Sequence, residues 1–272
     1  MTASPQNPQT VYALSNSDPA APGRFNALSA LFDSETIRHL QACGVGEGWN
    51  CLEVGGGGGS IAAWLGNRVG PTGHILVTDI DPRFLTGLAS QNVEIRQHNI
   101  VTDPLPDSSF DLIHIRLVLI HIAEREQVLA RLVAALKPGG WLVEEEFDSA
   151  SLLPDPHLFP GELPLDTQKA AMRVLDDRGV DRRWGRRLFA QMRGLGLQSV
   201  QAEAHLSIWH GGSPGAALMR VNFDQLRSAI LEAGYVTPQQ FDADTARLDD
   251  PAFFGPSSTM WTVRGRRPAP LK

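Results

Sequence analysis

A run of five glycines at positions 55–59 constrains the fold of this chain more than any other feature of its sequence. Residues 51–54 have the apolar character of the end of a buried strand, and a helical pattern begins directly after Ser60. A turn made of glycine lets the backbone approach a ligand closely, because no side chain stands in the way. The start of the following helix adds free N–H groups and the positive end of a helix dipole. The sequence therefore predicts a strand, turn and helix that hold a nucleotide-like cofactor.

The spacing of these glycines discriminates between nucleotide cofactors. The dinucleotide fingerprint, G-x-G-x-x-G or A, would need a glycine at Ser60 if it began at Gly55. A start at Gly57 gives a weaker variant that ends at Ala62, two residues late for the end of the strand. The phosphate-binding pattern G-x-x-x-x-G-K-[ST] does not occur in the sequence. The register that fits from the strand onward is acidic-x-G-x-G-x-G, formed by Glu53, Gly55, Gly57 and Gly59.

A second buried strand is predicted at 74–79, and it ends in the sequence Asp79-Ile80-Asp81. In nucleotide-binding folds, a carboxylate at this point, roughly twenty residues past the glycines, hydrogen-bonds to the hydroxyls of an adenosine ribose. Asp79 fits that position, 24 residues after Gly55. Asp81 is followed by Pro82, which instead indicates a helix N-cap with proline at the first helical position. We therefore expect Asp79 to bind the ribose.

Further motifs follow in a characteristic order. Strands are predicted at 93–98, 110–118 and 141–146, with a sharp turn at 137–140 before the last of these. The motifs Glu-Val-Gly-x-Gly-x-Gly, Phe-Asp-Leu-Ile, His-Ile and Leu-Lys-Pro-Gly-Gly succeed one another along the chain. This ordered set resembles the class I S-adenosylmethionine (SAM) methyltransferases of the small-molecule type, over about residues 24–148.

The resemblance implies a fold and a cofactor. The fold is α/β: a Rossmann-like, seven-stranded, mostly parallel sheet with helices on both faces, an antiparallel last strand and a helical lid insertion. The cofactor is SAM, which leaves as S-adenosylhomocysteine. Asn99 stands where the family more often has Asp against the adenine amine, although its amide oxygen can still accept that hydrogen bond. Besides the residues above, the resemblance assigns cofactor contacts to Arg24, Ile80, Asn99, Ile100 and Arg116.

The chain divides into three parts under this interpretation. Residues 1–23 form a mobile N-terminal segment and residues 24–148 the SAM-binding core. Residues 149–272 supply the lid helices, which determine acceptor specificity, and the strands that complete the sheet of the same domain. One or two helices are expected at 25–42, with a break near Asp33-Ser34, and a single strand at 199–209.

Methyl transfer from SAM is an in-line displacement, so much of the task is placement of donor and acceptor, worth roughly 7–11 kcal/mol of barrier. A general base adds a factor of about 10²–10⁴ when the acceptor must lose a proton. His121, after the fourth strand, is one candidate for this base, and Glu146 is the other. Glu144 and Glu146 share a face of the fifth strand, and we expect them at the mouth of the site or solvated at the sheet's edge. His114, in mid-strand, is expected to be a packing residue.

The charge and composition of the chain limit the classes of partner that it is expected to bind. The net charge of −6 argues against generic nucleic-acid binding, and no apolar run is long enough to span a membrane. The two cysteines have no metal-ligand spacing, and no secretory signal pattern begins the chain. We therefore expect a cytoplasmic, metal-free monomer or homodimer. The motif [Asn/Asp]-Pro-Pro-aromatic of adenine- and amide-nitrogen methyltransferases is missing after the fourth strand, which favours a small-molecule acceptor, such as a secondary metabolite.

Three alternatives remain open on the sequence alone. The chain could bind SAM and catalyse a different reaction, such as a cyclisation. It could also be a binding protein without catalysis. A nicotinamide oxidoreductase is disfavoured by Ser60 and depends on the late register that begins at Gly57.

Overall fold

The computed structural model describes residues 14–150 and 165–270. The expected mobility of residues 1–13, and the part of the expected lid region at 151–164, fall outside the described residues. Residues 14–23 were expected to be mobile, but they pack against the body of the protein: Leu14 is buried, and the first helix already begins at Ala21.

The centre of the molecule is one seven-stranded sheet with the strand order β3-β2-β1-β4-β5-β9-β6. Its strands are β1 (Asn50–Val54), β2 (His74–Asp79), β3 (Val93–Gln97), β4 (Phe110–Arg116), β5 (Leu136–Asp148), β6 (Gln198–His205) and β9 (Thr259–Arg266). The strands β1 to β5 pair in parallel, and β9 lies between β5 and β6, antiparallel to both. The predicted mostly parallel sheet with an antiparallel last strand is therefore confirmed.

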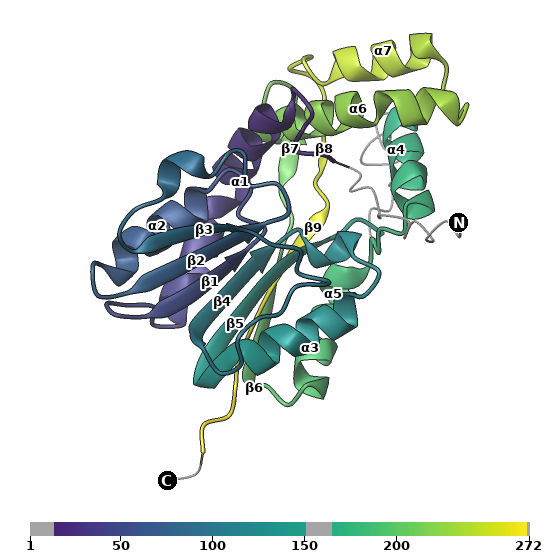
Figure 1. Ribbon diagram of the computed structural model, residues 1–272. Helices are drawn as coiled ribbons and strands as arrows, with labels where there is room; N and C mark the ends of the chain where they lie inside the picture. Colours follow the sequence, from purple (N-terminus) through teal and green to yellow (C-terminus); the bar gives the residue numbers. More distant parts are fainter. Residues whose placement is uncertain (1–13, 151–164, 271–272) are drawn as a thin grey trace, which may run out of the picture.

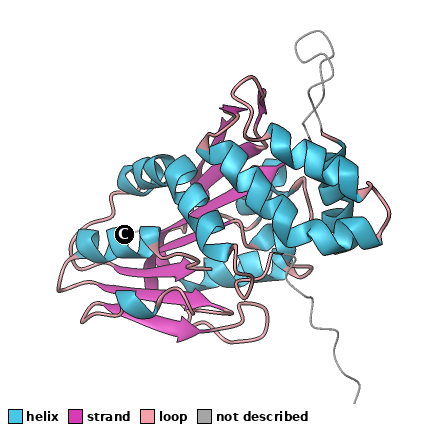
Figure 2. Ribbon diagram, turned by 90° about the horizontal axis from the view of Figure 1, so that it is seen from above, coloured by secondary structure: helices cyan, strands magenta, loops and turns pink. Residues whose placement is uncertain are grey.

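Helices cover both faces of this sheet (Figures 1 and 2). One face packs against α1 (Ala21–Ala42) and α2 (Ser60–Val69), and the other packs against α3 (Arg125–Ala135) and α5 (Trp184–Gly194). The central strands bury mostly apolar side chains on both faces, as in other covered parallel sheets. In β1, for example, Cys51 packs into the core on the α1 side and Leu52 into the core on the α5 side.

A helical cap stands beyond the carboxyl ends of the parallel strands (Figure 1). It consists of α4 (Asp166–Asp177), α6 (Pro214–Glu232), α7 (Pro238–Arg247) and a two-stranded ribbon of β7 (Ile208–His210) and β8 (Phe254–Pro256). Two helices of the cap begin at capping residues in the local sequence. Ser213 caps α6, and Thr237 and Gln240 form a capping box on α7. The cap has its own apolar cluster, which reaches Phe32 of α1 and Phe147 of β5.

Four local expectations are wrong. The helix α1 runs through Asp33-Ser34 without a break, because tertiary packing outweighs the weak helix propensity there. Residues 137–140, expected as a turn, lie within β5, where a register shift against β4 absorbs the left-handed Gly139. No α-helix starts at Asp81-Pro82, and a short 3₁₀ turn at Thr86–Leu88 follows instead. The strand expected at 199–209 is divided between β6 and β7. Among the described residues, no helix combines the length and apolar character needed to cross a bilayer.

Candidate functional site

The glycine turn adopts the alternating conformation that its register predicts. Gly55, Gly57 and Gly59 have φ angles of 71°, 53° and 80°, in the left-handed region that favours glycine. A Cβ on Gly55 would lie 2.4 Å from Val118 Cγ2, and one on Gly57 would lie 2.8 Å from the Phe25 ring. The turn is therefore restricted to glycine by its backbone and by its neighbours.

The glycine turn lies at the point of the sheet where the order of the strands along the chain reverses. The strand β1 is flanked by β2 on one side and by β4 on the other, so the chain order reverses at this strand. In open α/β sheets, ligands bind beyond the carboxyl ends of the strands at such a switch point. The helical cap stands over the same end of the sheet (Figure 1), which makes this the candidate site.

Asp79 ties the end of β2 to the glycine turn. Its Oδ2 accepts the Gly57 N–H at 3.0 Å, and its Oδ1 accepts the Asp81 N–H at 2.9 Å. The Asn16 side-chain amide also donates to Oδ1 at 3.5 Å and to the Asp81 carbonyl at 3.2 Å. Burial raises the pKa of Asp79, and the backbone N–H groups partly oppose this. A ligand that bonds to Asp79 would therefore compete with Asn16, whose role no sequence pattern indicated.

The predicted adenine contacts lie at the carboxyl ends of β2 and β3. Ile80 is 59% exposed, which is unusual for a large apolar side chain, and Ile100 is buried. The Asn99 Oδ1 accepts the Val101 N–H at 3.0 Å, and the Asn99 N–H donates to Asp103 at 2.8 Å. The amide oxygen retains a second lone pair for a ligand. The role of these residues in binding stays a prediction.

Arg24 reaches from α1 to the segment that precedes it. Its Nη2 donates to the Leu14 carbonyl at 3.1 Å and to Asn16 Oδ1 at 3.3 Å. The guanidinium carbon lies 4.8 Å from the centroid of the Phe25 ring, which itself packs against the glycine turn. Arg24 thus lies close to the turn, as expected of a residue that meets the carboxylate of a cofactor.

A buried charged network crosses the sheet on its α1 side, and we call Glu53, His114 and Glu145 the triad. The His114 Nδ1 lies 2.7 Å from Glu53 Oε2, and its Nε2 lies 3.1 Å from Glu145 Oε2. Glu53 and His114 are direct partners in the pairing of β1 with β4. Burial alone would lower the pKa of His114, but the two carboxylates outweigh it and raise this pKa to about 9. His114 was expected to be a packing residue, and it is the charged centre of this network.

Arg116 extends the network to α1. Its Nη2 donates to Asp33 Oδ1 at 2.9 Å, and its Nη1 donates to Thr36 Oγ1 at 2.9 Å. Thr36 in turn donates to Glu145. Arg116 was predicted to contact the cofactor, but its guanidinium is engaged by these protein groups, which anchor α1 on the sheet.

The expectation that Glu144 and Glu146 lie at the mouth of the site is wrong, because both side chains are fully buried on the α5 side. The Trp184 Nε1–H donates to Glu144 at 2.9 Å. Glu146 Oε1 accepts the backbone N–H groups of Val118 and Ile120, at 3.0 and 3.1 Å. Glu146 was predicted as a base, but its bonds hold the loop after β4 rather than face open space.

His121 ends a short 3₁₀ turn (Leu119–His121) in that loop. Burial, followed by the nearby charges of Arg24 and Arg125, lowers the pKa of His121 to about 3. The imidazole is therefore neutral at neutral pH. Such a low basicity suits an acceptor of hydrogen bonds better than an acceptor of protons.

Comparisons with known proteins agree with this geometry. A family model described as a methyltransferase domain matches residues 52–143. Methyltransferase str3 of Strobilurus tenacellus is 31% identical over 144 residues, which cover 52% of this chain and 50% of that protein. The ubiquinone/menaquinone biosynthesis C-methyltransferase UbiE of Pseudomonas syringae pv. syringae is 34% identical over 116 residues, which cover 40% of this chain and 45% of that protein. The match therefore spans about half the length of these curated relatives.

Solved structures share the fold. A putative methyltransferase from Bacillus halodurans C-125 superposes with a TM-score of 0.59 at 15% identity, over 87% of this chain and 100% of that chain. Phosphoethanolamine N-methyltransferase 2 of Haemonchus contortus, solved with phosphomonomethylethanolamine and S-adenosylhomocysteine, gives 0.58 at 15% identity, over 94% of this chain and 60% of that chain. Residues 52–143 thus match a methyltransferase domain, and the solved structures share the fold that carries it.

Proposed function

We propose that this chain is a SAM-dependent methyltransferase that acts on an oxygen, nitrogen or carbon atom of a small molecule. The observation that carries the proposal is the turn at 55–59, where Gly55, Gly57 and Gly59 are left-handed at the switch point of the sheet. A turn of this form offers backbone N–H groups and close approach to a nucleoside. The match of residues 52–143 to a methyltransferase domain supports the same function.

The residues around the turn fit the groups of SAM. Asp79 offers a carboxylate at the end of β2, Ile80 offers an exposed apolar surface beside it, and Arg24 offers a cation close to the turn. The cofactor, when bound, supplies a methyl group activated by a sulfonium, so the protein's own part is binding and orientation. We assign cofactor binding to Arg24, Glu53, Gly55, Gly57, Gly59, Asp79, Ile80, Asn99 and Ile100.

His121 is the side chain that we assign to the acceptor. Its neutral ring can accept a hydrogen bond from a hydroxyl or amine and so orient that group. Because the pKa of His121 is lowered to about 3, we propose that its main role is to orient the acceptor group. The proton that the acceptor loses then passes to water. A variant His121→Gln should then keep more activity than His121→Ala.

The cap is the part of the chain that we assign to acceptor recognition. Two of its buried polar atoms, Gln168 Oε1 on α4 and Asn222 Oδ1 on α6, have no hydrogen-bond partner among the described residues. Buried polar atoms normally have a partner, and the donor groups of a polar acceptor would provide one. An acceptor with an apolar body and a few polar groups, as in many secondary metabolites, matches the apolar cap cluster around them.

Calorimetry with S-adenosylhomocysteine tests the proposal. The unchanged protein should bind one equivalent with a Kd in the micromolar range. Gly57→Ala should weaken binding at least 10-fold, because a Cβ there is strained and would press on Phe25. Gly44→Ala is the matched control, because Gly44 has a φ of 82° but open space around it. It should keep the affinity of the unchanged protein.

Two outcomes decide the reaction class. The absence of binding by folded protein at millimolar ligand would overturn the proposal. If SAM binds, turnover with a labelled methyl group distinguishes the alternatives. Label that appears on the acceptor supports methyl transfer, whereas label that stays on SAM while the acceptor is converted would show a different reaction.

A further inference from the structure

The hydrogen bonds of the triad define the charge on His114. Both ring nitrogens face carboxylate oxygens, at 2.7 Å for Glu53 and 3.1 Å for Glu145. A carboxylate only accepts hydrogen bonds, so both ring nitrogens must donate and the ring is an imidazolium. A buried charge of this kind is tolerated only when it is paired and hydrogen-bonded. The triad is therefore a fully buried cation held between two anions.

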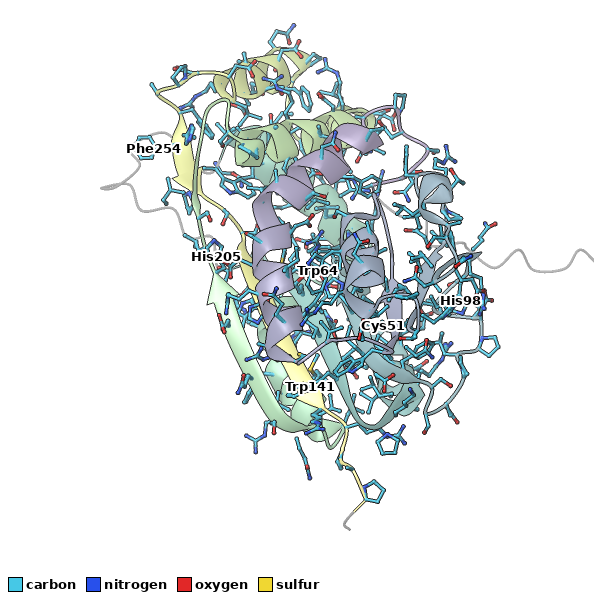
Figure 3. The ribbon with its side chains drawn as sticks, turned by 90° about the vertical axis from the view of Figure 1, so that its left-hand side faces the viewer. Cys51, Trp64, His98, Trp141, His205 and Phe254 are labelled. Atoms are coloured by element: carbon cyan, nitrogen blue, oxygen red, sulfur yellow. The ribbon has the colours of Figure 1, made fainter. Side chains whose placement is uncertain are left out.

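The Glu145 end of the triad is fixed in place. Thr36 of α1 donates to Glu145 Oε2, and Thr262 of β9 donates to Glu145 Oε1 at 2.8 Å. With Thr36 and Thr262 as donors, both oxygens of Glu145 accept hydrogen bonds, as a charged carboxylate does. Figure 3 looks onto this α1 side of the sheet, with His205 of the edge strand β6 at one margin and His98, just after β3, at the other.

At the Glu53 end of the triad, only one of the two carboxylate oxygens is hydrogen-bonded by the residues that the structure describes. Glu53 Oε2 bonds to His114, while Glu53 Oε1 accepts no hydrogen bond from the residues that the structure describes. Glu53 lies two residues before Gly55, at the end of β1, and its side chain is 6% exposed. A carboxylate held through one oxygen, with its second oxygen unengaged beside a ligand-binding turn, is suited to accept a hydrogen bond from a cation.

We propose that His114 is a positioning residue for cofactor binding. Fixed by Glu145, it holds the Glu53 carboxylate so that Oε1 accepts a hydrogen bond from the ammonium group of the cofactor's methionine part. This inference rests on the proposed function, because it requires SAM or S-adenosylhomocysteine at the glycine turn. The triad should therefore affect the binding of the amino-acid portion of the ligand, whereas Asp79, Ile80 and Asn99 bind the adenosine portion.

A pair of ligands tests this division. S-adenosylhomocysteine carries the amino-acid portion, whereas 5′-methylthioadenosine has the same adenosine and thioether without it. His114→Gln, which cannot be charged, should raise the Kd for S-adenosylhomocysteine about 10-fold or more. The Kd for 5′-methylthioadenosine should change less than twofold, measured by calorimetry on the full chain. A purely structural role for His114 would weaken both ligands alike.

Two further variants keep the test decisive. His39→Gln replaces another buried histidine on the same side of the sheet, away from Glu53, and should leave both affinities unchanged. Should His114→Gln fail to fold, Glu145→Gln removes the anion behind the histidine. It should weaken S-adenosylhomocysteine at least threefold and spare 5′-methylthioadenosine.

The outcomes separate this inference from the proposed function. Selective loss of S-adenosylhomocysteine in the triad variants supports it. Equal loss of both ligands, or loss of neither, overturns the inference while the proposed function stands. If the unchanged protein binds neither ligand, the proposed function fails and this inference fails with it.

Discussion

The three consecutive glutamates of β5 are all buried, yet the two sides of the sheet treat them in opposite ways. Glu145 faces α1, where His114, Arg116 and Thr36 overcome the effect of burial and lower its pKa to about 2. Glu144 faces α5, where burial raises its pKa to about 8 despite the hydrogen bond from Trp184. For Glu146, burial and the neighbouring Glu144 raise the pKa well above its usual range.

This contrast shows that the partners of a buried carboxyl, rather than its burial, decide its charge. The α1 side supplies cations and holds charge beside the glycine turn. The α5 side supplies only an indole N–H and backbone N–H groups, so its carboxyls are neutral at neutral pH and serve as acceptors within the fold. Each side of β5 thus supports a different part of the candidate site.

Removal of the cation on the α1 side should have the largest effect on stability. His114→Leu leaves Glu53 and Glu145 buried without their partner, which should cost about 3–5 kcal/mol in the free energy of unfolding. Urea denaturation at pH 7 measures it. As a control, His39→Leu removes a buried imidazole whose pKa burial lowers, and should cost under about 2 kcal/mol. Equal losses in the two variants would contradict an ionised α1 side.

Loss of the acceptor on the α5 side should rank second. Glu146→Leu leaves the buried N–H groups of Val118 and Ile120 without a partner, which should cost about 2–3 kcal/mol for the two together. Glu146→Gln keeps a carbonyl oxygen there and should cost less than about 1 kcal/mol. The same denaturation experiment compares the two. If Gln were as costly as Leu, Glu146 would have to act as a charged group, and the contrast between the two sides would fail.

The pH dependence of stability should separate the two sides further. Because the pKa of Glu144 is raised to about 8, the folded protein binds more protons than the unfolded chain from about pH 4.5 to 8. Its contribution to stability therefore falls as pH rises through that window. Glu144→Gln, which keeps the acceptor for Trp184, should gain about 1–3 kcal/mol relative to the unchanged protein between pH 5 and pH 8. A difference that does not vary with pH would mean that Glu144 is already charged at pH 5.

On the α1 side, the stability contributed by Glu145 depends on pH in the opposite direction. With its pKa lowered to about 2, Glu145 contributes stability that is complete above the pKa of the unfolded chain and is lost as pH falls toward 2. His114, with its pKa raised to about 9, contributes stability that is complete below its unfolded pKa and is lost as pH rises through 9. Unfolding free energies at pH 3 and pH 9.5 should therefore respond to variants of the triad.

The smallest effect is expected at the outer end of the network. Asp33→Asn weakens the partly buried ion pair with Arg116 and should cost about 1 kcal/mol or less. Glu35→Gln changes the neighbouring exposed pair with Arg38 and should remain within about 0.5 kcal/mol. Thermal unfolding at low salt resolves the difference. A larger loss at Glu35 than at Asp33 would indicate that the network does not extend to α1 as described.

The sequence was sufficient where the information was local. The alternate glycines at 55, 57 and 59 and the carboxylate at the end of β2 follow from strand, turn and helix signals within short windows, and the structure has them where the patterns placed them. The mostly parallel sheet with its antiparallel last strand followed from the family resemblance. These features depend on neighbours in the chain or on a fixed succession of motifs.

The sequence was insufficient where contacts between distant segments decide the outcome. The pairing of Glu53 with His114 depends on the register between β1 and β4, and Glu145 joins them across β5. Burial of Glu144 and Glu146 depends on α5 and on the loop after β4, which no pattern in β5 reveals. Asn16 reaches Asp79 from 63 residues away. Charge states at the site therefore required the structure.

A crystal structure with S-adenosylhomocysteine would show whether the glycine turn and the triad bind the ligand together. We expect the ligand over the glycine turn, with its ribose hydroxyls on Asp79, its adenine against Ile80, and its ammonium group within hydrogen-bond distance of Glu53 Oε1. The bond between Glu53 and His114 should be retained. A ligand bound elsewhere, or bound at the turn with its ammonium group away from Glu53, would show that Glu53 and the glycine turn do not form one cofactor site.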